Sequence, residues 1–103
     1  MIRRGVVKDF DEIREILRKN GDVIARDFKA EIVGIFGSYA RGEQRKESDV
    51  DIVVRFKEGA SLLDLVGLAD FLEEKLGIKV DVVSERAIRP ELKDHILKEL
   101  VSV

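Results

Sequence analysis

Three short runs of β-forming residues, separated by longer amphipathic stretches, constrain the fold of this chain more than any other feature. The runs cover residues 32–36, 49–56 and 78–83. Around them, apolar residues recur at the spacing that is typical of helices with one buried face. The resulting order α-β-α-β-α-β-α predicts an α/β (α+β) fold, in which helices cover one face of a small mixed β-sheet.

The first amphipathic stretch, residues 9–28, predicts a helix. Asp9 with Glu12 three residues later resembles a capping box, although the usual first residue is Ser or Thr. Gly21 weakens the middle of the stretch, so two shorter helices are the alternative.

The second and third amphipathic stretches also predict helices. Ser61 is the expected N-cap of a helix over residues 61–76, and Gly77 lies just past its end. The expected buried stripe of that helix is Leu62, Leu65, Val66, Ala69, Leu72 and Leu76. A last helix begins near Pro90 and is expected to present Leu92, Ile96 and Leu100 on one side.

Length and composition limit the classes of protein that this chain can represent. With 103 residues the chain has the size of one domain, which we expect to span residues 1–103. The absence of cysteine excludes disulfides, zinc fingers, iron–sulfur clusters and thiol catalysis, and it favours the reducing cytoplasm.

Charge and hydropathy argue against two kinds of partner. The 19 basic and 21 acidic residues nearly cancel, so no bulk charge drives strong binding to nucleic acid or to an anionic membrane. No apolar run approaches the length of a membrane-spanning helix, and the start Met1–Gly5 leads into no signal-peptide region.

Three aspartates interrupt the β-forming runs. Asp49 and Asp51 lie two residues apart on one predicted strand, so both carboxylates leave the same face of the sheet. Asp81 interrupts the third run, and all three converge if the third strand pairs beside the second. Three like charges require a cation, and oxygen donors favour Mg²⁺ or Mn²⁺. The alternative is a strand end with solvated or lysine-paired acids.

A glycine-bounded turn follows the first run. At Gly37 and Ser38 the backbone N–H groups and a hydroxyl can approach an anion closely, and a helix starting at Tyr39 adds its dipole. The turn matches neither Gly-x-x-x-x-Gly-Lys-Ser/Thr nor Gly-x-Gly-x-x-Gly. An ordinary strand-to-helix connection is the alternative interpretation.

Together, the turn and the aspartates resemble a known signature. The run Gly37-Ser38-Tyr39-Ala40-Arg41-Gly42, followed after five residues by Ser48-Asp49-Val50-Asp51, resembles the DNA polymerase β-type nucleotidyltransferase superfamily. More narrowly, it is similar to the pattern Gly-Ser-x-Ala-Arg-Gly…Ser-Asp-x-Asp of the minimal nucleotidyltransferase (MNT) proteins. Asp81 fits the third family carboxylate. The resemblance implies a nucleotidyltransferase fold core, with the motifs spread over about residues 30–84.

The resemblance also implies roles for these residues. Asp49, Asp51 and Asp81 are the expected catalytic carboxylates and ligands of two Mg²⁺ ions. Gly37 and Ser38 are expected to hold the β and γ phosphates of ATP. Attack on the α-phosphorus then leaves a nucleotide on the acceptor and releases pyrophosphate. Arg41 contacts a phosphate or a metal-ligand carboxylate in one interpretation and is a solvated helix residue in the other.

The family resemblance further implies a protein partner. MNT proteins act as antitoxins of all-helical HEPN-domain toxins, and some transfer AMP to a tyrosine of the toxin. The shortness of this chain predicts that a partner supplies the missing acceptor-binding half. The alternatives are an antitoxin that only covers its partner, and nucleotidyl transfer to a small molecule or, less in keeping with the near-neutral charge, to RNA.

Several further residues carry structural expectations. Tyr39 is expected to pack or to contact a partner, and His95 to be solvated or to face a partner. Ser48 is expected to cap the loop before the second strand. An ion pair with Asp81 is the simplest role for Lys79, and the segment Leu100–Val103 is a candidate partner surface.

Overall fold

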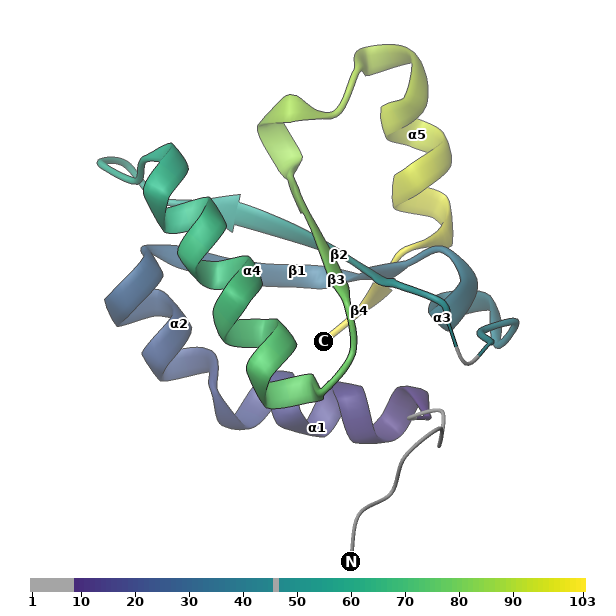
Figure 1. Cartoon of the computed structure of the whole chain (residues 1–103). Helices are drawn as coiled ribbons and strands as arrows, with labels where there is room; N and C mark the ends of the chain where they lie inside the picture. The colour runs from purple at the N-terminus through teal and green to yellow at the C-terminus, as the bar shows by residue number, and fades with distance from the viewer. Residues whose placement is uncertain (1–8, 46) are drawn as a thin grey trace, which may run out of the picture.

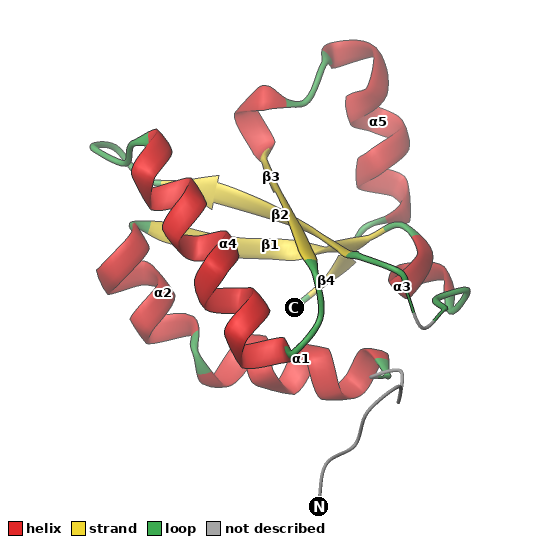
Figure 2. Cartoon of the chain, in the orientation of Figure 1, coloured by secondary structure: helices red, strands yellow, loops and turns green. Residues whose placement is uncertain are grey.

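A four-stranded sheet with strand order β3-β2-β1-β4 organises the protein (Figures 1 and 2). The computed structural model describes residues 9–45 and 47–103, so the expected absence of a targeting segment at Met1–Gly5 lies outside the described residues. The strands are β1 (Ala30–Phe36), β2 (Val50–Phe56), β3 (Val80–Ser84) and β4 (Val101–Ser102). The helices are α1 (Phe10–Lys19), α2 (Gly21–Phe28), α3 (Ser38–Arg41), α4 (Leu62–Leu76) and α5 (Pro90–Glu99), with a 3-10 turn, η1 (Glu85–Ala87), after β3.

The sheet is mixed, as predicted. β1 pairs antiparallel with both β2 and β4, whereas β2 pairs parallel with β3. Parallel strands need a crossover connection, and α4 provides it between β2 and β3. The fold class expected from the sequence is therefore confirmed.

The first amphipathic stretch forms two helices, which confirms the alternative suggested by Gly21. The carboxylate of Asp9 accepts a hydrogen bond from the Glu12 N–H at 2.8 Å and caps α1. At the junction, the side chain of Asn20 donates to the carbonyl of Ile16 at 2.8 Å. The chain turns at this point, and α2 begins at Gly21.

The main hydrophobic core lies between one face of the sheet and the helices α1, α2 and α4. Figure 1 shows these three helices together on one side of the sheet and α5 apart from them on the other. The fully buried side chains of this core include Ile13, Leu17, Ile24, Ile35, Val50, Ile52, Val54, Leu68, Leu72 and Leu76. The expectation that helices cover one face therefore holds for α1, α2 and α4, but not for α5.

The predicted stripe of α4 was wrong in its first half. Leu62 and Val66 are 74% and 49% exposed, whereas Leu68, which the predicted stripe omitted, is fully buried with Leu72 and Leu76. The N-terminal half of α4 carries apolar residues around most of its circumference. Spacing alone therefore allowed two stripes, and contact with the sheet selects one.

The C-terminal segment differs most from the sequence-based expectation. Val101 and Ser102 form β4 and pair with Ile35 and Gly34, so this part of the predicted partner surface is an edge strand. Two residues are too few to produce a recognisable strand pattern. Gly34 permits the pairing because a Cβ at that position would lie only 2.5 Å from the backbone carbonyl oxygen of Val101 in β4.

The last helix was also predicted incorrectly in detail. Its expected apolar side is not buried: Leu92 is 49% exposed, and Leu100 lies just past the end of α5.

None of the described helices combines the length and the apolar character that crossing a bilayer would require.

Two leucine substitutions in α4 test this packing. Leu72→Ala is expected to lower the free energy of unfolding by about 2–5 kcal/mol, because it opens a cavity in the core. Leu63→Ala removes the same atoms from a side chain that is 81% exposed, so we expect a change within about 0.5 kcal/mol. Guanidinium titration measures both, and equal losses would contradict the orientation of α4.

Candidate active site

The parallel pairing of β2 with β3 brings two of the predicted carboxylates together. Asp51 and Asp81 are each the second residue of their strand, and they lie directly opposite each other in the register. Directly opposed residues of neighbouring strands point to the same face of a sheet. Asp49 immediately precedes β2 and is exposed. The strand pairing on which the predicted convergence depended is therefore present.

The carboxylates occupy the face opposite the main core. Val50 and Ile52, the neighbours of Asp51 along β2, are fully buried in that core. Because side chains alternate along a strand, Asp51 and Asp81 point to the other side of the sheet, away from α4. On that face Asp49 and Asp81 are exposed, and Asp51 is partly buried.

The three carboxylates influence one another electrostatically. The pKa of Asp51 is raised to about 6, first by partial burial and then by the negative charges of Asp81 and Asp49. Arg41 opposes this shift with its positive charge. A divalent cation beside these residues would relieve the repulsion and favour the ionised form of Asp51.

The side chains, as they stand, are not gathered tightly around one point. Within residues 9–45 and 47–103, no three acidic or histidine side chains are close enough together to hold a metal ion. The all-oxygen donor set and the mutual effect on the pKa of Asp51 fit a hard divalent ion that would draw these side chains together.

The glycine turn lies directly against one of these carboxylates. Gly37 has φ +80° and ψ −151°, a backbone conformation that is almost exclusive to glycine. A Cβ at this position would collide with the Oδ2 atom of Asp51. The register explains the contact, because the preceding residue, Phe36, pairs with Asp51. The turn predicted to bind phosphates and the predicted metal ligands therefore form one continuous surface.

The helix after the turn is a single turn long. α3 spans Ser38–Arg41, and the Arg41 N–H donates to the carbonyl of Gly37 at 3.1 Å. Ser38 thus occupies the first position of α3, next to Gly37. The backbone of this turn can offer N–H groups to an anion that lies near Asp51.

Arg41 is neither free nor in contact with the three aspartates. Its Nε donates to Glu43 at 2.9 Å and its NH1 to Glu99 at 3.1 Å. The side chain is 45% exposed, which agrees with the interpretation as a solvated helix residue, whereas its carboxylate partners are not the predicted metal ligands. Nothing in the sequence pointed to Glu99, which lies 58 positions away on α5.

The neighbouring residues have mainly structural roles. Tyr39 is 2% exposed and packs in the main core, and burial followed by the charge of Asp49 raises its pKa. The hydroxyl of Ser48 accepts from the Arg45 N–H at 2.7 Å and caps the loop before β2, as predicted. His95 is exposed and lies 3.5 Å from Glu99. Within the described residues, Lys79 makes no ion pair with Asp81.

Comparison with known proteins identifies the family. A family model described as a nucleotidyltransferase domain matches residues 10–103. The chain belongs to this family. It is a nucleotidyltransferase of the minimal (MNT) type, as the motifs indicated.

Two relatives illustrate the similarity. A Methanocaldococcus jannaschii protein, named provisionally as a protein adenylyltransferase, is 52% identical over 91 residues, covering 88% of this chain and 97% of its own. The protein adenylyltransferase MntA of Thermococcus cleftensis is 39% identical over 93 residues, with coverages of 90% and 94%.

Solved structures confirm the fold of this nucleotidyltransferase. One, named provisionally as a minimal nucleotidyltransferase, has a TM-score of 0.81 at 38% identity and covers 93% of this chain and 97% of its own. A toxin–antitoxin structure with AMP-PNP has a TM-score of 0.57 at 30% identity, with coverages of 80% and 61%. A complex of a tri-AMPylated Shewanella oneidensis HEPN toxin with an MNT antitoxin has a TM-score of 0.52 at 26% identity, with coverages of 78% and 61%.

Two glycine substitutions test the contact between the turn and Asp51. Gly42→Ala at φ +73° faces open space and is expected to cost about 1 kcal/mol of stability from backbone strain. Gly37→Ala adds a collision with Asp51, so we expect a loss of about 2–4 kcal/mol.

Chemical denaturation measures both losses. The additional substitution Asp51→Ala should recover part of the loss in Gly37→Ala. Equal losses at positions 37 and 42, or no recovery, would contradict the close approach.

The pKa of Asp51 leads to a prediction about pH and stability. Ionising the Asp51 carboxyl costs more free energy in the folded state than in the unfolded state. The protonated carboxyl therefore makes its full contribution to the free energy of unfolding below about pH 4, and this contribution is lost as pH rises through about 6. In the metal-free protein, Asp51→Asn is therefore expected to raise the free energy of unfolding by about 1 kcal/mol at pH 7.5, after allowance for solvent screening.

The matched control for this titration is Asp70→Asn, at an exposed position of α4. Urea unfolding in EDTA between pH 4 and 8 provides the measurement. The gain in the free energy of unfolding from Asp51→Asn should shrink toward pH 4. A gain that grows as pH falls would show that the pKa of Asp51 is not raised in the folded protein.

Proposed function

We propose that this nucleotidyltransferase transfers AMP from ATP to a hydroxyl group of a HEPN-domain toxin and thereby acts as an antitoxin. One observation carries the proposal: the β2–β3 register that places Asp51 beside Asp81, with Gly37 packed against Asp51. The backbone N–H groups of the turn lie next to paired carboxylates, which supports nucleotidyl transfer because that reaction needs a phosphate-binding group beside metal ligands. The names of the relatives and of the solved complexes supply the acceptor class.

In the proposed reaction, Asp49, Asp51 and Asp81 would hold two Mg²⁺ ions, which Mn²⁺ could replace. The ions, when bound, neutralise the triphosphate and stabilise the charge that develops during transfer. The residues of this chain set the geometry. The N–H groups of Gly37 and Ser38 and the Ser38 hydroxyl orient the β and γ phosphates, and Asp51 lies beside them.

Bond making and bond breaking then follow from that orientation. The acceptor hydroxyl oxygen bonds to the α-phosphorus of ATP while the bond to the bridging oxygen of pyrophosphate breaks. Asp81 is exposed and lies beside Asp51, so its carboxylate can accept the hydroxyl proton. The products are pyrophosphate and an AMP group on the acceptor, for which we propose a tyrosine.

Arg41 adds positive charge near this site. Its guanidinium is paired with Glu43 and Glu99 but still lowers the pKa of Asp51, so it is close enough to attract a triphosphate. We propose that it exchanges one of its carboxylate partners for a phosphate when ATP binds.

The central test is transfer of label. The protein is incubated with labelled ATP, Mg²⁺ and the product of the neighbouring gene, and intact mass spectrometry then follows the gain of one AMP group. Asp49→Asn and Asp51→Asn are each expected to reduce the rate at least about a hundredfold, because charge stabilisation at the site is lost. Asp70→Asn, an exposed position on α4, is the matched control.

Three outcomes would contradict parts of the proposal. Labelling that persists in both site variants would show that the carboxylate assignment is wrong. Stoichiometric neutralisation of the partner without labelling would favour an antitoxin that acts by covering its partner. Labelling of a small molecule, with none on the protein, would favour a different acceptor class.

A further inference from the structure

The outer edge of β3 is a free strand edge beside the candidate active site. β3 is the terminal strand on its side of the sheet, while the opposite edge is formed by β4, which has only two residues. Short edge strands protect a protein against unwanted pairing. β3, by contrast, has five residues, and Asp81 is one of them.

The backbone groups that face outward from β3 can be assigned. The carbonyl of Lys79 accepts from the Val50 N–H at 2.9 Å, so this carbonyl faces β2. In a parallel ladder alternate residues face the partner strand, and the backbone of Val80, Val82 and Ser84 therefore points away from β2. The N–H of Val80 donates to the carboxylate of Glu73 in α4 at 3.1 Å, which confirms that it faces away from β2.

The remaining outward donors have no partner in the structure. Within the described residues, no hydrogen bond from outside the sheet engages the N–H of Val82 or Ser84. Proteins commonly guard such edges with lysine, proline or a bulge. β3 has the sequence Val-Asp-Val-Val-Ser and pairs with β2 in unbroken register, so it has no lysine, proline or bulge, and its one charged residue is Asp81 of the candidate site.

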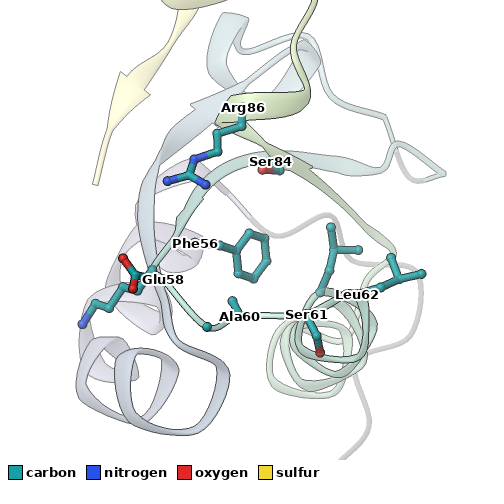
Figure 3. A pocket seen from close by; sticks show the side chains of 10 residues that line it. Phe56, Glu58, Ala60, Ser61, Leu62, Ser84 and Arg86 are labelled. Atoms are coloured by element: carbon teal, nitrogen blue, oxygen red, sulfur yellow. The ribbon is translucent and has the colours of Figure 1, made fainter.

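A hollow lies at each end of β3. At its start, a hollow of about 450 Å³ is lined by Asp49, Ile78 and Lys79, among others. At its end, a hollow of about 460 Å³ is lined by Phe56, Leu62, Leu65, Ser84 and Arg86, among others. Figure 3 shows Phe56 at the centre of this second hollow, between Ser84 and the start of α4. A segment lying along β3 could therefore place side chains in the hollow at either end of the strand.

We propose that an extended segment of the partner protein, carrying the acceptor hydroxyl, pairs with the outer edge of β3. This inference rests on the proposed function and specifies how the acceptor is presented. A strand added there lies about 4.8 Å from β3, and its residue opposite Asp81 points to the same face as Asp81 and Asp51. Its neighbours along the segment point to the opposite face. The pairing thus selects one acceptor residue by position.

A second copy of the chain fits this edge less well. Two β3 strands paired antiparallel around Val82 would bring both Asp81 residues to one face, two positions apart, where their negative charges repel each other. An edge occupied by a second copy would also be closed to the acceptor segment that the proposed function requires. The continuity of the edge with Asp81 therefore favours the acceptor segment as the occupant.

Ser84 offers a substitution that removes an outward N–H without disturbing the fold. Its φ is −73°, which proline adopts, and the preceding Val83 lies in a strand, which suits a residue before proline. The Ser84 side chain makes no capping hydrogen bond to the 3-10 turn. Ser84→Pro is therefore the test variant, and Ser84→Ala, which retains the N–H, is its matched control.

The first readout is the rate of AMP transfer to the product of the neighbouring gene at limiting partner concentration. Ser84→Pro is expected to reduce this rate at least tenfold, while Ser84→Ala stays within twofold of the unmodified chain. Both variants should retain Mg²⁺-dependent ATP binding, measured by calorimetry, which shows that the site itself is intact. Equal rates for the proline and alanine variants would overturn the proposal.

The second readout does not depend on catalysis. Amide hydrogen exchange is measured by NMR on the full chain, free and saturated with the same partner. The N–H groups of Val82 and Ser84 are expected to exchange at least tenfold more slowly in the complex. Protection of these amides without AMP transfer would support the docking while refuting the proposed function.

Three results of the exchange experiment would overturn the docking proposal. One is unchanged exchange at Val82 and Ser84 in a saturated complex, and another is the absence of any complex. The third is protection that already appears in the free protein and grows with its concentration, since a second copy would then occupy the edge.

Discussion

The parallel pairing of β2 with β3 is the constraint on which the rest of the site depends. It holds Asp51 opposite Asp81, although two carboxylates at that separation repel each other. The backbone ladder and the burial of the alternate residues Val50, Ile52 and Val54 supply the free energy that keeps the strands together. The opposite face of the same strands is thereby left available for charge.

The glycine turn is coupled to this pairing through β1. Because β1 is antiparallel to β2, its end meets the beginning of β2, and Phe36 pairs with Asp51. The chain leaves β1 at Gly37, whose lack of a side chain lets the backbone come against the Asp51 carboxylate. The glycine turn and the carboxylates are thus brought together by strand register rather than by any direct bond between them.

Parts of the molecule were predictable because they depend on local spacing. The alternation in residues 49–56 identified a strand with Val50, Ile52 and Val54 on the core face, and the capping pattern at Ser61 located the start of α4. Other parts were not predictable. The stripe of α4 was misjudged because an excess of apolar residues left its orientation to the sheet, and β4 was missed because two residues carry no pattern.

The sequence by itself identified the residues for which we propose the chemistry: two aspartates at strand spacing, a third in a later run, and a Gly-Ser turn between β-forming segments. These features are local, so their residue types and spacing are sufficient. Only the tertiary structure decided that Asp81 stands opposite Asp51, that Glu99 pairs with Arg41, and that β3 has a free edge. Each of these depends on contacts between segments far apart in the chain, and strand order is set by the packing of all the segments together.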